Sequence, residues 1–461
     1  MRRLSTVRTW LSSVSPPPTA HILQKYPIQI VESRLAFTRL SPSFSERAAL
    51  NRRVSTFARC SRSHKRRKKI MPDNTVHGFV ADRFDAVREA FSANLASGVD
   101  VGASCCATVD GETVVDLWGG FADEAKTRPW EKDTIANVFS TTKTMTALTA
   151  LLLADRGELD FDAPVARYWP EFAANGKGAI RVSHLMSHSS GLSGWREPLA
   201  PDDLYDWEKA TSLLAAQAPL WEPGTASGYH VTTFGFLLGE VVRRITGKSL
   251  GTVFREEIAA PLEADFHIGL PASEDHRVAE IIPWAVTQST DKPTLSEIQT
   301  ITFFNAAFDA KMATRTRAWR AAEIPAVNGH GNARSIAEIH CILANAGVAK
   351  GKRFMSEAGC RKALEQQIEG PDLIMSHLPP ARFGLGFALP GPLLALELPN
   401  PNTIHWGGGG CSWIFIDMDA RTTFAYAANK MDRLPLGDPR PFRTMEALWQ
   451  SLGIRSGAAR T

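Results

Sequence analysis

Long apolar segments are missing from this chain of 461 residues. A membrane-spanning helix needs roughly 18 or more apolar residues in succession, and the most apolar run, residues 147–154, is far shorter. Cysteines are also few, six in all, and none stands in a C-x-x-C or zinc-ligand spacing. The sequence therefore predicts neither a transmembrane helix nor a zinc site, and it favours a reducing compartment.

Most of the chain has fewer basic than acidic residues, although the formal net charge of the whole chain is +4. Residues 1–70 hold 16 Lys and Arg with only two acids, a net of +14. The remaining residues, 71–461, hold 36 basic and 46 acidic residues, a net of −10. A globular part with this balance has no general reason to bind nucleic acid, so we expect no nucleic-acid partner.

The basic charge belongs to a leader, residues 1–71, which is rich in Arg and Ser and ends in Lys65-Arg66-Arg67-Lys68-Lys69. This composition is typical of an organelle transit peptide or a disordered tail. Three interpretations stay open: a mitochondrial presequence, a nuclear-type basic cluster, and an extension created by the choice of start site, because Met71 precedes the first amphipathic pattern. We expect an intracellular protein, cytoplasmic or mitochondrial, and the sequence leaves its oligomeric state open.

The first part of the remaining domain, residues 72–455, predicts a helix followed by a hairpin. Apolar residues recur at three- and four-residue steps from Val80 to Leu95 and stop at Gly98. Strand patterns at residues 102–109 and 112–117 then flank Asp110-Gly111, a typical tight antiparallel turn. Cys105 and Cys106 fall in the first strand, where neighbouring side chains face opposite sides.

The last part of the domain repeats the combination of sheet and helix. Strand patterns at residues 412–418 and 422–428 precede a helical pattern at residues 442–452. Residues 140–334 are mostly helical in pattern, with connections rich in Pro and Trp. We therefore predict an α+β fold, with a sheet part at about residues 72–139 and 335–455 and a helical part at about residues 140–334.

Ser140 begins an almost wholly apolar helical pattern, and Lys143 lies one turn farther on the same face. The positive end of the helix dipole favours a developing alkoxide. A lysine in a poorly solvated pocket has a lowered pKa and accepts a serine proton. The pair predicts a serine nucleophile with a lysine base, and a helix N-cap in the core is the alternative.

Two other patterns compete with this site. Ser289-Thr290-Asp291-Lys292 has the same S-x-x-K spacing, but Pro293 and polar neighbours indicate a loop. His184 and His188 are spaced like a metal-binding pair, yet no third ligand of suitable spacing accompanies them. We predict no metal and no organic cofactor.

Two later motifs extend the pattern begun by Ser140: Pro223-Gly224-Thr225-Ala226-Ser227-Gly228-Tyr229-His230, and His405-Trp406-Gly407-Gly408-Gly409-Gly410. Together the three motifs resemble, in order, those of the superfamily of penicillin-binding proteins, class C β-lactamases and family VIII carboxylesterases. The resemblance covers roughly residues 80–450. It implies a β-lactamase/transpeptidase-like fold, in which an antiparallel sheet flanked by helices carries an inserted all-helical subdomain.

The resemblance also implies roles for the residues of the two later motifs. Tyr229 would act with Lys143 as base and later as acid for the leaving group, its pKa lowered by a nearby ammonium. His405, Trp406, Gly407 and Gly408 would form the substrate-binding strand, with the amides of Gly408 and Ser140 as the oxyanion hole.

Two departures from the resemblance bear on the substrate. The β-lactamase and peptidase branches usually carry asparagine where this chain has Val231, and lysine where it has His405. Both missing groups bind polar or anionic parts of β-lactams and peptides, and a neutral imidazole is a poorer anchor for a carboxylate. The departures favour neutral esters.

The sequence thus predicts a serine hydrolase that cleaves a small-molecule carboxylic ester through an acyl-enzyme on Ser140. Three alternatives stay open. One is an acyltransferase (transesterase) of a biosynthetic pathway, in which an alcohol replaces water. Another is a β-lactamase or D-aminopeptidase. The third is a non-catalytic scaffold or filament-forming protein on the same fold.

Overall fold

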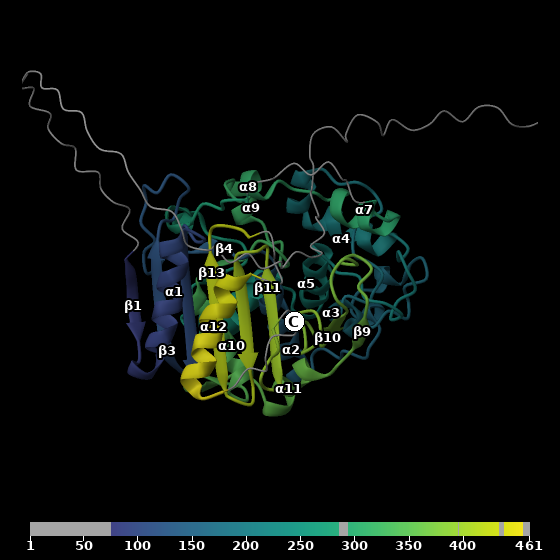
Figure 1. Cartoon of the computed structure of the whole chain (residues 1–461). Helices are drawn as coiled ribbons and strands as arrows, with labels where there is room; N and C mark the ends of the chain where they lie inside the picture. Colours follow the sequence, from purple (N-terminus) through teal and green to yellow (C-terminus); the bar gives the residue numbers. More distant parts are fainter. Residues whose placement is uncertain (1–74, 285–293, 395, 433–437, 455–461) are drawn as a thin grey trace, which may run out of the picture. The chain divides into compact units, whose positions relative to one another are not determined.

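A six-stranded antiparallel sheet combines strands from both ends of the chain, in the order β1-β3-β2-β13-β12-β11 (Figure 1). The computed structural model describes residues 75–284, 294–394, 396–432 and 438–454. Apart from Thr294, these residues belong to one compact unit. The predicted leader, residues 1–71, lies outside the described residues.

The large sheet is accompanied by three small ones, with the orders β4-β6-β5, β10-β9 and β7-β8. The strands are β1 (Val76–Val80), β2 (Gly102–Val109), β3 (Glu112–Gly120), β4 (Ala136–Asn137), β5 (Phe266–His267), β6 (His330–Gly331), β7 (Val348–Ala349), β8 (Lys352–Arg353), β9 (Ile368–Gly370), β10 (Ala381–Phe383), β11 (Thr403–Gly408), β12 (Ser412–Asp417) and β13 (Thr422–Ala428).

The predicted hairpin is present between β2 and β3. Asp110 and Gly111 both have positive φ, 51° and 86°, which is the conformation that the tight two-residue turn requires. Cys105 and Cys106 enter different apolar clusters on the two faces of the sheet, as the strand pattern predicted. The strands predicted near residues 412 and 422 also form, as β12 and β13.

One local prediction is wrong, because Val80 does not belong to the first helix. It ends β1, which pairs antiparallel with β3. The helix α1 (Asp85–Ser97) begins after a 3-10 turn at Asp82–Phe84 and ends at Gly98, with φ of 74°. Val80 ends a strand and Phe84 lies in the turn before the helix. Their spacing of four residues is the same as that of two residues on one face of a helix, and this produced the wrong prediction.

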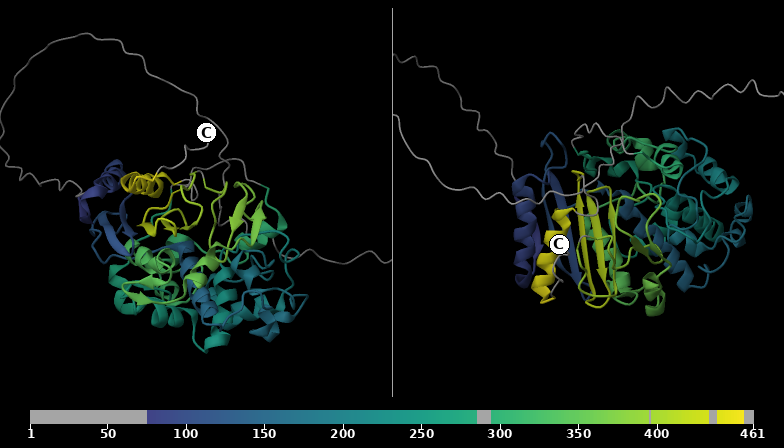
Figure 2. Two further views of the ribbon diagram at one scale, coloured as in Figure 1. Left: turned by 90° about the horizontal axis from the view of Figure 1, so that it is seen from below. Right: turned by 45° about the vertical axis from the view of Figure 1, so that its right-hand side comes forward.

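Helices cover both faces of the large sheet. The α-helices after α1 are α2 (Thr142–Asp155), α3 (Val182–Met186), α4 (Trp207–Ala216), α5 (Thr233–Thr246), α6 (Leu250–Phe254), α7 (Glu297–Phe304), α8 (Ala310–Ala313), α9 (Arg317–Ala321), α10 (Ala333–Ala344), α11 (Glu357–Arg361) and α12 (Pro439–Leu452). Figure 2 shows α1 and α12 together on one face, with the helical part of the chain on the other side of the strands. The limits predicted for the sheet and helical parts remain a proposal.

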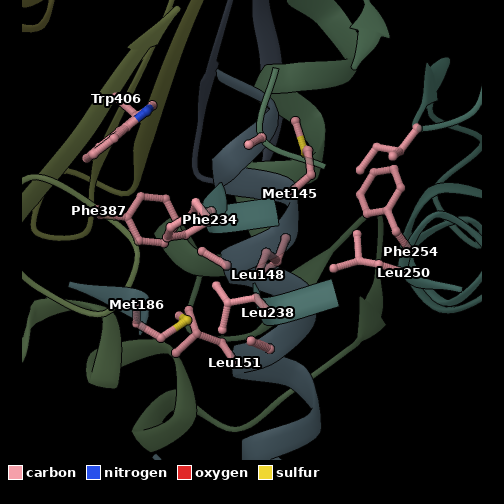
Figure 3. Packing of buried hydrophobic residues seen from close by; sticks show 14 of the residues in the cluster. Met145, Leu148, Leu151, Met186, Phe234, Leu238, Leu250, Phe254, Phe387 and Trp406 are labelled. Atoms are coloured by element: carbon pink, nitrogen blue, oxygen red, sulfur yellow. The ribbon is translucent and has the colours of Figure 1, made fainter. Parts of the chain in front are cut away.

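The two faces have separate apolar cores. One lies under α1 and α12, and the larger one joins α10 and the sheet to α2 and α5. In Figure 3, the side chain of Leu148 from α2 lies near that of Leu238 from α5, and Met145 and Phe234 belong to the same cluster. Every residue of α2 from Thr142 to Leu153 is buried, so the helix is held on all sides. The start of α2 is therefore held in place by the packing around it.

The described cysteines and helices agree with the absences noted in the sequence. Cys105, Cys106, Cys341, Cys360 and Cys411 are buried and unpaired, while Cys60 lies outside the described residues. Among the helices of the described chain, none has the length and apolar character needed to cross a membrane.

Candidate active site

Ser140 lies in a sharp 3-10 turn, Phe139–Thr141, directly before α2. Phe139 has a φ of 43°, which bulky residues rarely adopt and which the surrounding structure must hold in place. The hydroxyl of Thr142 donates to the Phe139 carbonyl at 2.6 Å and accepts from the amide of Gly329 at 2.8 Å. These bonds fix the backbone that presents Ser140 at the edge of the buried helix.

Lys143 is completely buried and touches three oxygen atoms. Its Nζ lies 3.1 Å from Ser140 Oγ, 2.8 Å from the Val231 carbonyl and 3.0 Å from the Ala326 carbonyl. Burial lowers the pKa of Lys143 well below its usual value. A neutral amine has two N–H groups, which match the two carbonyls, and its lone pair then faces Ser140 Oγ. Lys143 is thus arranged to accept the serine proton.

Tyr229 approaches Ser140 from the other side. Its hydroxyl donates to Ser140 Oγ at 2.7 Å, and the centre of its ring lies 4.9 Å from Lys143 Nζ. Burial raises the pKa of Tyr229, so the prediction that a nearby ammonium lowers it is wrong. The physical reason is that burial disfavours the charged phenolate, and this desolvation is the largest contribution to the shift. Tyr229 therefore stands beside the serine as a phenol, a hydrogen-bond donor.

Several aromatic side chains pack around Tyr229, and the His188 ring contacts each of them. The His188 ring centre lies 5.0 Å from that of Tyr229, 5.2 Å from Phe383 and 5.5 Å from Trp406. Burial lowers the pKa of His188 well below its usual value, so the ring is neutral. In the described part of the chain, no cluster of three or more His, Cys, Asp or Glu is suited to hold a metal ion, and His184 and His188 are no exception.

Strand β11 passes Ser140 so closely that a side chain does not fit at Gly408. A Cβ atom there would lie 2.1 Å from the Val138 carbonyl oxygen and 2.8 Å from the Thr141 amide nitrogen. The hydroxyl of Ser412, on β12, bonds to the Val138 carbonyl at 2.7 Å and to Thr141 Oγ1 at 2.9 Å. The glycine and this serine together hold β11 and β12 against the turn that carries Ser140.

Gly408→Ala should therefore separate β11 from the Ser140 turn. Because the obstructing atoms are backbone, we expect a loss of about 1 to 3 kcal/mol in the free energy of unfolding. A displacement of about 1 Å at the site should also lower kcat by roughly 10²-fold. Gly178→Ala is the control, since a Cβ there meets open space. Ester hydrolysis and chemical denaturation measure both effects, and equal values for the two variants would contradict the close approach.

His405 and Gly407 lie on the face of β11 that is turned toward the core under α1 and α12, and not on the face turned toward Tyr229. The His405 ring is buried, with its centre 6.0 Å from that of Trp413 and 5.9 Å from that of Phe415, in the core under α1 and α12. A Cβ on Gly407 would also meet the Trp413 ring. Trp406 alternates to the other face, with its ring centre 6.0 Å from that of Tyr229. Trp406 is therefore the side chain of β11 that faces Tyr229, whereas the His405 ring lies on the opposite face of the strand.

The hydrogen bonds of β11 also decide which glycine amide faces the site. Gly408 is paired with Ser412 on β12, and its carbonyl accepts from the Cys411 amide at 3.0 Å. In a trans peptide, the next N–H points opposite to that carbonyl, so the Gly409 amide points away from β12. A Cβ on Gly409 would meet the Phe139 side chain, beside Ser140. The geometry favours Gly409 over Gly408 as the oxyanion donor.

Arg440 supports this glycine turn, although the sequence analysis did not single it out. Its buried guanidinium donates to the Gly410 carbonyl at 2.7 Å. It also pairs with Asp100 at 2.8 Å and with Asp438 at 2.7 Å. Asp100 is 340 residues from Arg440, so no local pattern could have revealed the network. A second missed residue, Asp372, bonds to the backbone of Tyr229.

Two other serines also have the spacing of a nucleophile motif. Ser289 and Lys292 lie outside the described residues. Ser249 stands in Gly247-Lys248-Ser249-Leu250-Gly251, which has the G-x-S-x-G spacing of a strand-to-helix nucleophile turn. However, it follows the helix α5 instead of a strand. Its hydroxyl donates to Glu323 at 2.6 Å and caps α6 by accepting from the Thr252 amide at 3.3 Å.

Comparison with known proteins agrees with these motifs. The profile of the Beta-lactamase family matches residues 87–448. The Esterase/beta-lactamase LipL of Mycobacterium tuberculosis is 36% identical over 371 residues, which are 77% of this chain and 83% of that protein. The crystal structure of a family VIII carboxylesterase is 44% identical, with a TM-score of 0.77, and covers 82% of this chain and 100% of its own. A penicillin-binding protein homologue from Caulobacter crescentus is 38% identical, with a TM-score of 0.75 and the same coverage of both chains.

Proposed function

Because the chain belongs to the Beta-lactamase family, we propose that it is a serine hydrolase of the esterase kind, which cleaves a small-molecule carboxylic ester. The observation that carries the proposal is the pair of hydrogen bonds at Ser140 Oγ, 3.1 Å to Lys143 Nζ and 2.7 Å to the Tyr229 hydroxyl. A nucleophile, a base and an acid are within reach of one another, as acyl transfer requires. Its similarity to the esterase LipL and to a family VIII carboxylesterase supports the same activity.

The first half of the proposed reaction forms an acyl-enzyme. Neutral Lys143 takes the proton of Ser140, and Ser140 Oγ attacks the ester carbonyl carbon. The carbonyl oxygen becomes an oxyanion, which the amides of Ser140 and Gly409 stabilise. Backbone donors of this kind are each worth about 3 to 4 kcal/mol of barrier, because they are oriented before the charge develops.

The second half of the proposed reaction releases both products. The tetrahedral intermediate breaks its bond to the alcohol oxygen, which takes a proton from Tyr229, and the Lys143 ammonium restores the phenol. Water then gives a proton to Lys143 and attacks the acyl carbon, and the acid leaves as Ser140 regains its proton. Lys143 therefore acts as the base and Tyr229 as the acid, a division that fits the opposite directions of their pKa shifts.

The wall of the site favours neutral substrates. The side chain of β11 that faces Tyr229 is the uncharged indole of Trp406, so a substrate carboxylate meets no ammonium at this position. The His405 ring lies on the other face of the strand, against Trp413 and Phe415. Esters with an uncharged acyl part and an uncharged alcohol are the expected class, and β-lactams, which carry a carboxylate, are expected to be poorer substrates.

Trapping the acyl group tests the proposal directly. We expect the protein to release p-nitrophenol from p-nitrophenyl butyrate and to gain the mass of one butyryl group. Peptide mapping should place that group on Ser140. Turnover with the acyl group on another residue, or no turnover and no adduct on a panel of uncharged esters, would contradict the proposal.

Three added arms of this experiment separate the alternatives. If an added alcohol captures most of the acyl group in preference to water, the protein is an acyltransferase. If nitrocefin is hydrolysed faster than the ester, it is a β-lactamase. A protein that is only a scaffold would form no adduct with a fluorophosphonate, which acylating serine enzymes take up at the nucleophile.

A further inference from the structure

We infer that Asp372 is a positioning residue of this site, which anchors Tyr229 and sets its role as the proton donor. The inference rests on the ester chemistry proposed for Ser140 and adds a residue to it. Asp372 lies in the connection between β9 and β10, far from Tyr229 in the chain. Among the described residues, the Asp372 side chain bonds to the backbone of Tyr229 and not to Ser140, so it acts through Tyr229.

One oxygen of Asp372 holds both its own turn and the backbone of Tyr229. Oδ1 accepts from the amides of Ile374 and Met375, each at 2.9 Å, which closes the turn. The same atom accepts from the Tyr229 amide at 3.0 Å. Charge-assisted bonds to backbone N–H groups are stronger than neutral ones. Tyr229 is thereby tied to a turn that lies 143 residues away in sequence.

Further hydrogen bonds fix the turn that carries Asp372. The Leu373 amide donates to the Ser227 carbonyl at 2.8 Å, two residues before Tyr229. On the opposite side, the Gln299 side chain of α7 donates to the Ile374 carbonyl at 2.9 Å and to Ser376 Oγ at 3.1 Å. The turn therefore lies between α7 and the Tyr229 segment and is bonded to both. A change at Asp372 is expected to reach Tyr229 without passing through Ser140.

Asp372 also places a carboxylate against the backbone of Tyr229. Its side chain is 4% exposed, and Oδ2 is buried without a hydrogen-bond partner among the described residues. This charge, after burial itself, raises the pKa of Tyr229, whereas the contacts with Ser140 and Trp406 lower it. The other titratable neighbours of the phenol are Lys143 and His188, and burial favours the neutral form of both. Among these neighbours in the described part of the chain, Asp372 is the carboxylate, and it is bonded to the backbone of Tyr229.

The charge of Asp372 favours one of two positions for a single proton in the site. The proton either stays on Tyr229, with Lys143 as a neutral amine, or moves to Lys143 and leaves a phenolate. A carboxylate bonded to the backbone of Tyr229 opposes the phenolate by like-charge repulsion. It thereby keeps Lys143 available as the base and keeps a proton on Tyr229 for the leaving alcohol. This assignment of roles does not follow from Ser140, Lys143 and Tyr229 alone.

The variant Asp372→Asn tests the charge while retaining an oxygen that accepts the three N–H groups. We expect the Tyr229 phenol to ionise about one pH unit lower than in the wild type, which is a shift typical of removing one nearby charge. Near-ultraviolet absorbance of phenolate measures this directly, and Tyr229→Phe identifies which part of the signal belongs to Tyr229. The alkaline limb of the kcat/KM profile should move by the same amount.

Asp417→Asn is a matched control for the structural role of such a carboxylate. Asp417 is also 4% exposed, and its Oδ1 closes a turn by accepting from the amides of Asp419 at 3.0 Å and Ala420 at 2.8 Å. In the described part of the chain, its side chain bonds to Asn400, Asp419 and Ala420 and not to the site residues. We expect Asp417→Asn to leave both the phenolate signal and the pH profile unchanged, even if it lowers stability.

Two results would overturn the inference. One is a phenolate signal in Asp372→Asn that is unchanged from the wild type, and the other is an equal shift in Asp417→Asn. Because the absorbance titration needs no turnover, it decides the point even if the protein hydrolyses no ester. Activity of the wild type with an unshifted Asp372→Asn variant would leave the proposed function in place and remove only the role of Asp372.

Discussion

Replacing Ser140 with alanine should lower kcat for p-nitrophenyl butyrate by roughly 10⁴- to 10⁶-fold, the range typical of losing a covalent nucleophile. Lys143 and Tyr229 both bond to Ser140 Oγ, and neither can replace it as the attacking atom. The loss should appear in kcat and kcat/KM alike, and the variant should show no acyl adduct by mass spectrometry.

Ser249→Ala is the control for this prediction, because Ser249 also has a nucleophile-like motif spacing. Its hydroxyl caps α6, so the variant should lose about 1 kcal/mol of stability and keep its activity. If Ser140→Ala and wild-type protein hydrolyse the ester at comparable rates, Ser140 is not the nucleophile.

Replacing Lys143 with methionine should lower kcat by roughly 10²- to 10⁴-fold, the usual contribution of a general base. In the wild type, only the neutral amine accepts the serine proton. Activity should therefore rise with pH through the lowered pKa of Lys143, and the Lys143→Met variant should lack this rise. A pH series of kcat/KM for both proteins measures the effect.

The same lysine has a predictable effect on stability. Its pKa in the folded protein lies well below the usual value of 10.5, so between these two values the unfolded chain binds more protons than the folded one. The contribution of Lys143 to stability is therefore unfavourable at low pH and becomes less so as pH rises through that window. Wild-type protein should gain stability relative to Lys143→Met as pH rises, as denaturant unfolding at several pH values would show.

Lys177→Met is a matched control for both measurements. Lys177 is also buried, and its Nζ donates to the carbonyls of Ala174, Ala215 and Gln217. Burial lowers its pKa to about 8. Among the described residues, Lys177 Nζ bonds to these carbonyls and not to Ser140. The Lys177→Met variant should therefore show a similar kind of pH-dependent stability with unchanged activity. A loss of activity equal to that of Lys143→Met would argue against a specific role of Lys143.

Much of the architecture followed from local patterns in the sequence. The Asp110-Gly111 turn and the buried helix after Ser140 each depend on residues within a few positions of one another, where sequence spacing and spatial neighbourhood coincide. The family resemblance supplied the rest of the fold. The three side chains expected to act together, those of Ser140, Lys143 and Tyr229, lie within contact of one another in the structure.

The details that sequence could not supply are those decided by long-range pairing. A run of glycines has no side-chain pattern that tells which face of the strand is turned toward the core and which toward the site. The sequence therefore could not show whether His405 or Trp406 faces Tyr229. The choice between the Gly408 and Gly409 amides depends on the ladder with β12. The direction of the Tyr229 pKa shift depends on burial and on Asp372, which a motif does not record.

The pairing of β13 with β2 has a consequence for synthesis on the ribosome. β13 (Thr422–Ala428) is the strand that joins β2 to β12 and β11, so the early hairpin emerges long before its partner exists. Until then, β2 exposes an open edge that can associate with other nascent chains. A chain terminated shortly before residue 422 would carry Ser140, Lys143, Tyr229 and the whole of β11, yet it would lack the strand that holds them in one sheet.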